Sequence, residues 1–357
     1  MKSKLIGKTL DELKAIVSSL SLPAFTALQM ADWLYKKRVT SIDEMTNLSK
    51  VARAKLNDMY CVGYDELIGS QLSKDGTKKY LFRCVPIKND FSCNIDNSDT
   101  WAIESVIIPD ADRVTICVSS QAGCRMGCKF CMTGRQGFHG NLDAGSIISQ
   151  FLNIAEKESL TNAVFMGMGE PLDNLENVLK AIEILTSDWG FGWSPKRITL
   201  STIGVTDLKN ENPLKIFLDK TKVHLAVSMH NPFPEERKEI MPSENKFGIE
   251  KTLNIIRQYD FSGQRRVSFE YTMFDKLNDT KRHADRLARI LHGLECRVNL
   301  IRFHKIPDSN LQSSPMQVIE QFKERLNASG IIATLRASRG EDILAACGML
   351  SGKSTKE

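Results

Sequence analysis

The chain has 357 residues, a length that allows one large domain and a small one. Hydrophobic residues make up 42% and charged residues 25%, values that are ordinary for a soluble globular protein. No apolar run approaches the roughly 20 residues of a membrane span, and the N-terminus lacks the apolar core of a signal peptide, so we expect a cytoplasmic protein without membrane contact. The nine cysteines, an odd number, argue against a disulfide framework and favour metal or redox chemistry, whereas the formal charge of +5 is too small to indicate nucleic-acid binding by itself.

Residues 1–60 have the pattern of a small helical domain. Apolar residues recur at helical spacing in a first helix, at Leu10, Leu13, Val17 and Leu20. Pro23 opens a second helix, which the basic run 36–38 ends. The domain holds ten Lys and Arg against six Asp and Glu. This excess is compatible with a surface that faces a polyanion and with an ordinary solvated helical surface.

Residues 61–110 change to a pattern of short strands, and we interpret them as a β-rich connecting extension. The sequence Lys-Asp-Gly-Thr at 74–77 predicts a turn between two strand-like runs. Apolar and polar residues alternate over 101–108 and again over 114–119, which predicts two further strands. A polar loop is expected over 89–100.

From residue 119 onward, strand and helix patterns alternate, and we assign residues 111–350 to one core domain followed by a tail at 351–357. The predicted helices lie near 143–157, 175–186, 248–259, 279–292 and 315–328. The predicted strands lie at 163–166, 197–201, 223–228, 266–272, 297–301 and 331–335. Such alternation indicates an α/β fold with a parallel sheet covered by helices. Ligand sites are then expected at the carboxyl ends of the strands.

Three cysteines, Cys124, Cys128 and Cys131, stand within eight residues with the spacing C-x3-C-x2-C. Three thiolates on one loop can hold three irons of a four-iron cluster and leave the fourth iron open to a small molecule. A zinc site is the structural alternative. Zinc requires four ligands, and the fourth would have to come from His139 or from a distant cysteine.

Further polar groups follow the predicted strands. Gly169 and Glu170 come after the strand that ends at residue 166, where a glycine lets the backbone approach a ligand and a carboxylate can accept from an ammonium. Ser201 and Ser228 stand at the ends of two neighbouring strands, and Met229 and His230 follow the second. Each of these patterns is also common in plain turns and helix caps.

The ordered motifs together resemble the RlmN/Cfr family of radical S-adenosylmethionine (SAM) adenosine methyltransferases. The resemblance covers nearly the whole chain and rests on the runs CVSSQAGCRMGCKFCMTGRQGF, FMGMGEPLDN, LSTIG, SMHNP, EERKEIMP and RGEDILAACG. It implies a partial (β/α)6 barrel with an N-terminal helical domain. It also implies two cofactors, a [4Fe–4S] cluster held by the three cysteines of the loop and SAM bound to the open iron, where one electron splits SAM to a 5′-deoxyadenosyl radical.

The resemblance also implies roles for individual residues. Cys347 is expected to be methylated by a first SAM, and a radical from a second SAM takes a hydrogen from that methyl group so that it adds to an adenine carbon. Glu104 corresponds to the proton acceptor. Cys117 forms a transient disulfide with Cys347 and releases the base. Without the resemblance, both cysteines would be interpreted as small buried apolar residues and Glu104 as a solvated strand residue.

The SAM site implied by the resemblance comprises a larger set of residues: Gly169, Glu170, Ser201, Ser228, Met229, His230 and His304. His304 departs from the family pattern, in which an Asn contacts SAM. An imidazole can supply one comparable hydrogen bond.

The substrate expectation also comes from the resemblance. Pro171 in Gly-Glu-Pro favours the branch that methylates adenine C2 over the branch that methylates C8 and confers antibiotic resistance. The implied partners are 23S rRNA at adenosine 2503, tRNA at adenosine 37, and an electron donor such as flavodoxin or ferredoxin. We expect a monomer whose basic N-terminal helices bind folded RNA. A zinc-stabilised RNA-binding protein without catalytic activity is the alternative from another class.

Overall fold

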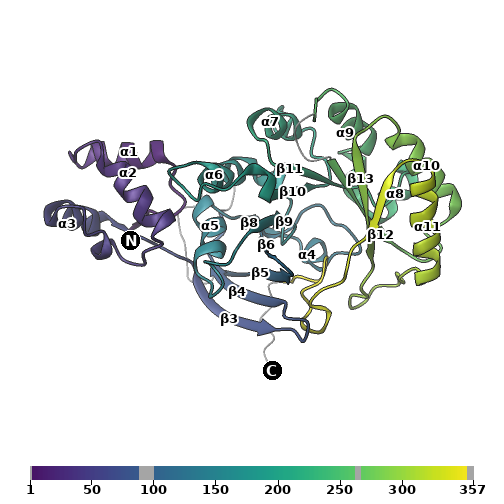
Figure 1. Cartoon of the computed structure of the whole chain (residues 1–357), viewed down its shortest axis with the longest axis horizontal. Coiled ribbons are helices and arrows are strands. Elements are labelled where there is room, and N and C mark those ends of the chain that lie inside the picture. The colour runs from purple at the N-terminus through teal and green to yellow at the C-terminus, as the bar shows by residue number, and fades with distance from the viewer. Residues whose placement is uncertain (1, 88–99, 262–266, 352–357) are drawn as a thin grey trace.

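The structure is a computed structural model that describes residues 2–87, 100–261 and 267–351. The predicted loop at 89–100, except Thr100, and residues 352–357 of the predicted tail lie outside the described residues. A curved sheet runs through the molecule, with helices on its outer side and the C-terminal segment along its inner side (Figure 1). None of the helices within the described ranges is long and apolar enough to cross a membrane.

Ten strands form the main sheet, in the order β14-β13-β12-β11-β10-β9-β6-β5-β4-β3. Seven of them, from β14 to β6, are parallel to their neighbours, and β5, β4 and β3 continue the sheet in antiparallel pairs. The parallel strands are β6 (Arg113–Cys117), β9 (Asn162–Phe165), β10 (Ile198–Thr202), β11 (His224–Ser228), β12 (Val267–Met273), β13 (Cys296–Arg302) and β14 (Ile332–Leu335). The antiparallel strands are β3 (Glu66–Leu72), β4 (Lys78–Cys84) and β5 (Trp101–Asp110).

The parallel strands are joined by six crossovers that contain helices, and most of these helices cover the outer face of the sheet (Figure 1). These helices are α4 (Met132–Arg135), α5 (Ala144–Leu152), α6 (Leu175–Thr186), α7 (Pro213–Lys220), α8 (Pro234–Ile240), α9 (Ile249–Ile256), α10 (Lys281–Leu291) and α11 (Met316–Ala328). A small hairpin of β7 (Gln121–Gly123) and β8 (Phe138–Asn141) flanks the cysteine loop. The prediction of an α/β fold with a parallel sheet is confirmed.

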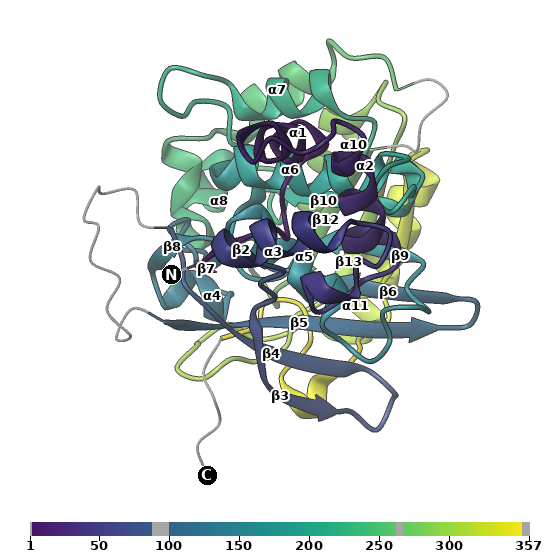
Figure 2. The same ribbon diagram turned by 90° about the vertical axis from the view of Figure 1, so that its left-hand side faces the viewer.

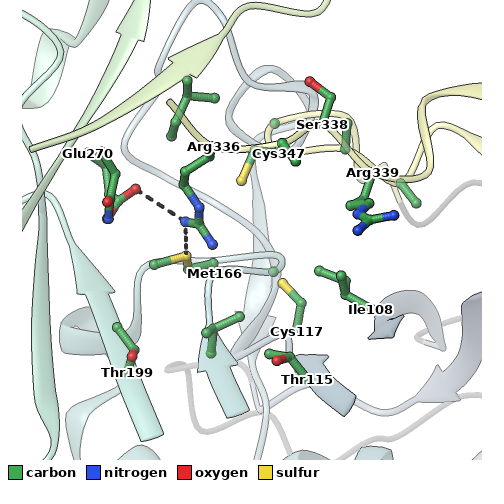
Figure 3. Close-up of a pocket in the computed structure, with 18 of the residues that line it drawn as sticks. Ile108, Thr115, Cys117, Met166, Thr199, Glu270, Arg336, Ser338, Arg339 and Cys347 are labelled. Carbon is green, nitrogen blue, oxygen red and sulfur yellow. Dashed lines mark hydrogen bonds and ion pairs between the residues drawn. The ribbon is translucent and has the colours of Figure 1, made fainter. Parts of the chain in front are cut away.

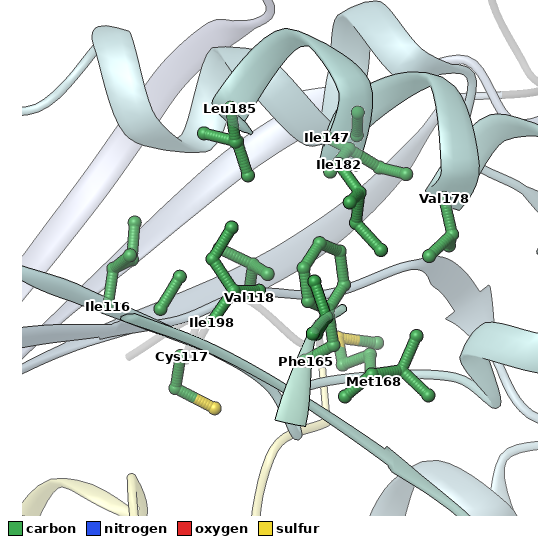
Figure 4. Close-up of a cluster of buried hydrophobic side chains, with 14 of the residues drawn as sticks. Ile116, Cys117, Val118, Ile147, Phe165, Met168, Val178, Ile182, Leu185 and Ile198 are labelled. Atoms are coloured by element: carbon green, nitrogen blue, oxygen red, sulfur yellow. The ribbon is translucent and has the colours of Figure 1, made fainter. Parts of the chain in front are cut away.

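Helix α6 shows why these segments pack as they do. Its apolar residues recur three and four positions apart, and Val178, Ala181, Ile182 and Leu185 are buried. They meet Phe165 and the outward residues of neighbouring strands in one apolar cluster (Figure 4). Helix α5 ends at Leu152, earlier than the predicted residue 157, because Asn153 leaves the helix and its side chain donates to the carbonyl of Asp65 at 2.9 Å.

The N-terminal region consists of α1 (Leu10–Ser19), α2 (Thr26–Ala31) and α3 (Lys50–Met59), framed by the parallel pair of β1 (Ser3–Lys4) and β2 (Tyr60–Cys61). Helix α1 begins at a capping box formed by Thr9 and Glu12. After α2 the chain continues as a short π-helix, Asp32–Lys36. Its residue Tyr35 packs against Trp189 of the core, with the ring centroids 5.9 Å apart. The three helices stand at one end of the molecule, beside α5 and α6 (Figure 2).

Candidate active site

Strand β6 places Cys117 on the inner face of the sheet. Its neighbours Ile116 and Val118 point to the outer face and pack under the helices, because side chains alternate along a strand (Figure 4). Cys117 therefore points away from the apolar cluster. Burial raises the pKa of its thiol to about 12.

Cys117 lines the larger of two adjoining cavities, which has a volume of about 480 Å³. The smaller cavity, of about 150 Å³, is lined by all three cysteines of the loop and by Glu170. Cys347 lines both cavities, and so do Cys131 and His304. Cys347 thus lies where the cavity of the cysteine loop meets the cavity that contains Cys117. Figure 3 shows the side chains of Cys347 and Cys117 on the larger cavity.

The cysteine loop is held by backbone hydrogen bonds on both sides. The amide of Cys124 donates to the carbonyl of Gly137 at 2.8 Å, and the amide of Met132 donates to the carbonyl of Gly348 at 2.7 Å. The second bond connects the loop directly to the residue that follows Cys347. All three cysteine residues are half-buried.

The arrangement of the three thiols around one cavity fits a four-iron cluster. Among the described residues, no three His, Cys, Asp or Glu side chains gather closely enough to hold a single metal ion. In a four-iron cluster each thiolate binds a different iron, so separate thiols around one cavity are what such a group requires. A tetrahedral zinc ion would instead need its ligands at one point.

Glu170 reaches the smaller cavity through a backbone that only glycine permits. Gly169 has a φ of +99°, and a Cβ at this position would lie 2.5 Å from the Cβ of Gln121. The Glu170 carboxylate accepts from the amides of Leu172 at 3.1 Å and Ile203 at 3.0 Å. Burial raises its pKa to about 7. A carboxylate buried in this way is poised to bind a ligand ammonium, which would favour its ionised form.

The structure places four of the other five predicted SAM residues on the smaller cavity. Ser201, Ser228, His230 and His304 line it. Met229 is fully buried and is not among the lining residues of either cavity. The backbone carbonyl of Met229 accepts a hydrogen bond from the side chain of Arg237 at 2.9 Å.

The two histidines differ in their surroundings. His230 is buried, accepts from the amide of Thr272 at 3.0 Å through Nδ1, and has a pKa that burial lowers to about 3. His304 lies 2.9 Å from the hydroxyl of Ser338 and 3.4 Å from Glu341, and burial lowers its pKa as well. His304 therefore connects the smaller cavity to the segment that carries Cys347.

Glu104 does not line either cavity. Its side chain is buried and ion-paired with Lys79 at 3.0 Å, and its second oxygen accepts from the amide of Ser351 at 2.8 Å. The segment that follows Cys347 reaches this carboxylate at Ser351, and it is also held at Leu350, whose carbonyl accepts from the hydroxyl of Thr133 at 2.7 Å. In this conformation the predicted proton acceptor is covered by the C-terminal segment.

The sequence did not point to two charged residues that lie near the thiols in the larger cavity, Arg336 and Glu270. Arg336 follows β14, and its guanidinium pairs with Glu270 of β12 at 3.2 Å (Figure 3). Burial raises the pKa of the Cys347 thiol, and Arg336 is the cation that acts in the opposite direction. Arg336 has the same effect on Cys117. Neither Arg336 nor Glu270 belongs to a motif with a recognisable spacing, so no local signal pointed to them.

A curved α/β sheet, a three-cysteine loop after its first parallel strand and a Gly-Glu turn after the second define a radical SAM protein. In agreement, residues 118–287 match the model of the Radical SAM superfamily, and residues 3–62 match that of the ribosomal RNA large subunit methyltransferase N-terminal domain. The chain belongs to the RlmN family of dual-specificity RNA methyltransferases.

Individual relatives support this assignment along the full length. The chain is 52% identical to the probable dual-specificity RNA methyltransferase RlmN of Parabacteroides distasonis, over 98% of this chain and 97% of that protein. It is 41% identical to the dual-specificity RNA methyltransferase RlmN of Syntrophus aciditrophicus, over 98% and 96%. A radical SAM methyltransferase from Sphaerobacter thermophilus superposes with a TM-score of 0.86 at 35% identity, covering 98% of this chain and 100% of that one.

These comparisons confirm the predicted family and fold class. They also confirm the expectation of a radical SAM enzyme that uses a [4Fe–4S] cluster and SAM. The alternative of a zinc-stabilised binding protein is not supported. The roles of individual residues and the domain boundaries remain predictions.

Proposed function

We propose that this enzyme methylates C2 of adenosine in RNA, at adenosine 2503 of 23S rRNA and adenosine 37 of certain tRNAs, through a methyl group carried on Cys347. The observation that supports this most directly is the position of Cys347 between the SAM cavity and the cavity that contains Cys117. A methyl carrier must face its donor on one side and its acceptor on the other.

The chemistry of the base explains why a carrier is needed. Adenine C2 lies between two electron-withdrawing nitrogens and is a poor nucleophile, so it cannot attack a sulfonium methyl group directly. When bound, the cluster and SAM supply the electron and the hydrogen-abstracting radical that this reaction requires. Cys124, Cys128 and Cys131 are the residues that would hold the cluster.

The remaining roles fall to the residues of the chain. Glu170 would bind the ammonium of SAM, and Ser201, Ser228, His230 and His304 would contact its other polar groups. Cys347 would receive a methyl group and become bonded to the adenine carbon through it. Glu104 would accept the proton from that carbon. The thiolate of Cys117 would then attack the sulfur of Cys347, so that a disulfide forms as the bond between that sulfur and the carried carbon breaks. The carbon takes up a proton and leaves as the methyl group of the released base, and a dithiol reductant must reduce the disulfide before the next turnover.

The covered position of Glu104 sets a requirement for this scheme. Its carboxylate is bonded to Lys79 and to the amide of Ser351. The segment after Cys347 must therefore move before Glu104 can reach an adenine in the larger cavity. The reaction requires an electron donor, such as a flavodoxin or ferredoxin. Its RNA substrates imply a cytoplasmic location, where ribosomes and tRNA are found.

The C8-methylating activity is the alternative within the family. Nucleoside analysis of rRNA and tRNA from a strain that lacks this gene distinguishes the two. We expect loss of 2-methyladenosine from both RNAs and its return when the gene is restored. Loss of 8-methyladenosine, with 2-methyladenosine retained, would contradict the proposed position of methylation.

A further inference from the structure

The larger cavity extends well beyond the two thiols, along the inner face of the sheet. Its lining includes residues at the beginnings of five parallel strands: Arg113 of β6, Asn162 of β9, Arg197 directly before β10, His224 of β11 and Arg297 of β13. Parallel strands begin at one edge of a sheet. The cavity therefore has two ends, a thiol end at the carboxyl ends of the strands and a second end at the strand starts.

The strand-start end is rich in arginine. Arg113 and Arg339 are partly neutralised, because both pair with Asp110, at 2.8 and 3.5 Å. Arg197 and Arg297 are exposed, and neither forms an ion pair with any carboxylate in the part of the chain that the structure describes. The other acidic residue of the cavity, Glu270, pairs with Arg336 near the thiols. Two cations thus remain available to a ligand at this end.

The dimensions of the cavity suit a single nucleotide. Cys117 follows Arg113 by four residues on one strand, which corresponds to roughly 13 Å at about 3.3 Å per residue. The surface between the two ends is lined by small polar groups, including Thr115 and Thr199, which lie on the strand-start side of Cys117 (Figure 3). A nucleoside whose base reaches the thiols would extend its ribose past these hydroxyls toward the arginines.

We propose that Arg197 and Arg297 bind the RNA phosphates that flank the target adenosine, so that the RNA approaches the larger cavity from the strand-start edge of the sheet. This inference rests on the proposed function, because it takes the occupant of the cavity to be an adenosine of an RNA chain. Guanidinium groups pair with phosphate oxygens through two parallel hydrogen bonds. The two arginines fix the orientation of the nucleotide, with its base toward Cys347.

The test compares the double variant Arg197→Ala/Arg297→Ala with the wild-type holoenzyme, using a short RNA stem-loop that has an adenosine in its loop. The dissociation constant is measured between about 0.05 and 0.3 M salt. Each lost phosphate contact reduces the slope of log Kd against log salt by about 0.7 to 0.9. We expect a decrease of about 1.5 in the slope, with Kd raised at least about tenfold at 0.1 M salt.

Two further variants make the result specific. Arg197→Lys/Arg297→Lys keeps both charges and should recover most of the binding. Arg289→Ala removes an exposed arginine from α10, outside the cavity, and should leave the slope unchanged. Mass spectrometry of the peptide that contains Cys347, after incubation with SAM but without RNA, should show normal methylation in all variants.

An unchanged slope in the double Ala variant would overturn the inference. So would an equal loss of Cys347 methylation, since the arginines would then support the fold or the SAM site. The proposed function fails separately, if the wild-type enzyme binds RNA and methylates Cys347 but transfers no methyl group to any adenosine. The salt slope still decides the role of the two arginines in that case.

Discussion

At the scale of single residues, the proposed chemistry depends on two thiols, one on the buried Cys117 and one on the exposed Cys347. Desolvation raises the pKa of both thiols, and a protonated thiol is a weak nucleophile. Arg336 lowers both values from its place in the same cavity. Arg336, which is bonded to Glu270 at 3.2 Å, therefore favours the thiolate form of both cysteines.

Arg336→Gln should slow the reaction of Cys347 with iodoacetamide at pH 8. Loss of the neighbouring positive charge raises the pKa of the Cys347 thiol, so a smaller fraction of it is present as the reactive thiolate. Alkylation of the Cys347 peptide is followed by mass spectrometry. Arg336→Lys should retain most of the rate, and Arg339→Gln, in the same cavity, should change it little. A wild-type rate in Arg336→Gln would exclude this role.

Cys117→Ala should trap a covalent RNA–protein adduct through Cys347. Release of the base requires attack by a second thiol, and alanine cannot supply one. The adduct would be seen as a band of reduced mobility on a denaturing gel that disappears on nuclease treatment. Cys296→Ala changes a buried cysteine of β13 that lines neither cavity and serves as the control. Normal turnover by Cys117→Ala would show that another group resolves the intermediate.

The sequence allowed these residues to be predicted to different degrees. The cysteine loop is recognisable from its spacing alone. Cys117 and Cys347 could be identified only through the family resemblance, because a single cysteine in a strand has no local signal. Arg336 and Glu270 were missed because they come together only in the folded protein, through a contact between β12 and the end of β14. No local sequence pattern predicts this contact.

At the scale of elements, the smaller cavity is lined by the ends of β10 and β11, and Arg237 of α8 is bonded to both ends. Its side chain is fully buried and donates to the carbonyls of Ile203, Ser228 and Met229 at 3.3, 2.8 and 2.9 Å. It also pairs with Glu244. One buried guanidinium thus satisfies three strand-end carbonyls and one carboxylate.

Arg237→Leu should lower the free energy of unfolding by about 3–5 kcal/mol, because it leaves Glu244 as an uncompensated buried charge. Urea denaturation of the cluster-free protein measures this change. Arg289→Leu, on the surface of α10, should stay within about 0.5 kcal/mol of the wild type. If both variants had the same unfolding midpoint, the strand ends would not depend on Arg237.

Regular elements were predicted well where the periodicity was long. The helix expected at 175–186 agrees with α6 (Leu175–Thr186), because its apolar stripe is continuous. The helix expected at 143–157 was too long, since a tertiary hydrogen bond from Asn153 redirects the chain. The π-helix at 32–36, where Tyr35 packs against Trp189 and Phe191, was not predicted, because the spacing of residues along the chain carries no signal for the wider turn.

At the scale of the whole molecule, the N-terminal helices are joined to the core by specific contacts. Gly7 packs directly on the backbone of Gly145 in α5, where a Cβ would lie 2.1 Å from its nitrogen. Lys4 pairs with the buried Asp65 at 2.6 Å, and Lys180 of α6 pairs with Glu12 at 3.2 Å. The N-terminal helices therefore have a fixed place beside the core, from which they could present their basic residues to an RNA.

The central claim, that the methyl group passes through Cys347 by a radical route, is tested most directly with SAM whose methyl group carries three deuterium atoms. The reconstituted enzyme is incubated with RNA under reducing, oxygen-free conditions, and the modified adenosine is analysed by mass spectrometry. One deuterium is removed when the carried methyl group becomes a methylene, so we predict 2-methyladenosine that retains two deuterium atoms. A product that retains all three would mean direct transfer to the base and would contradict the account.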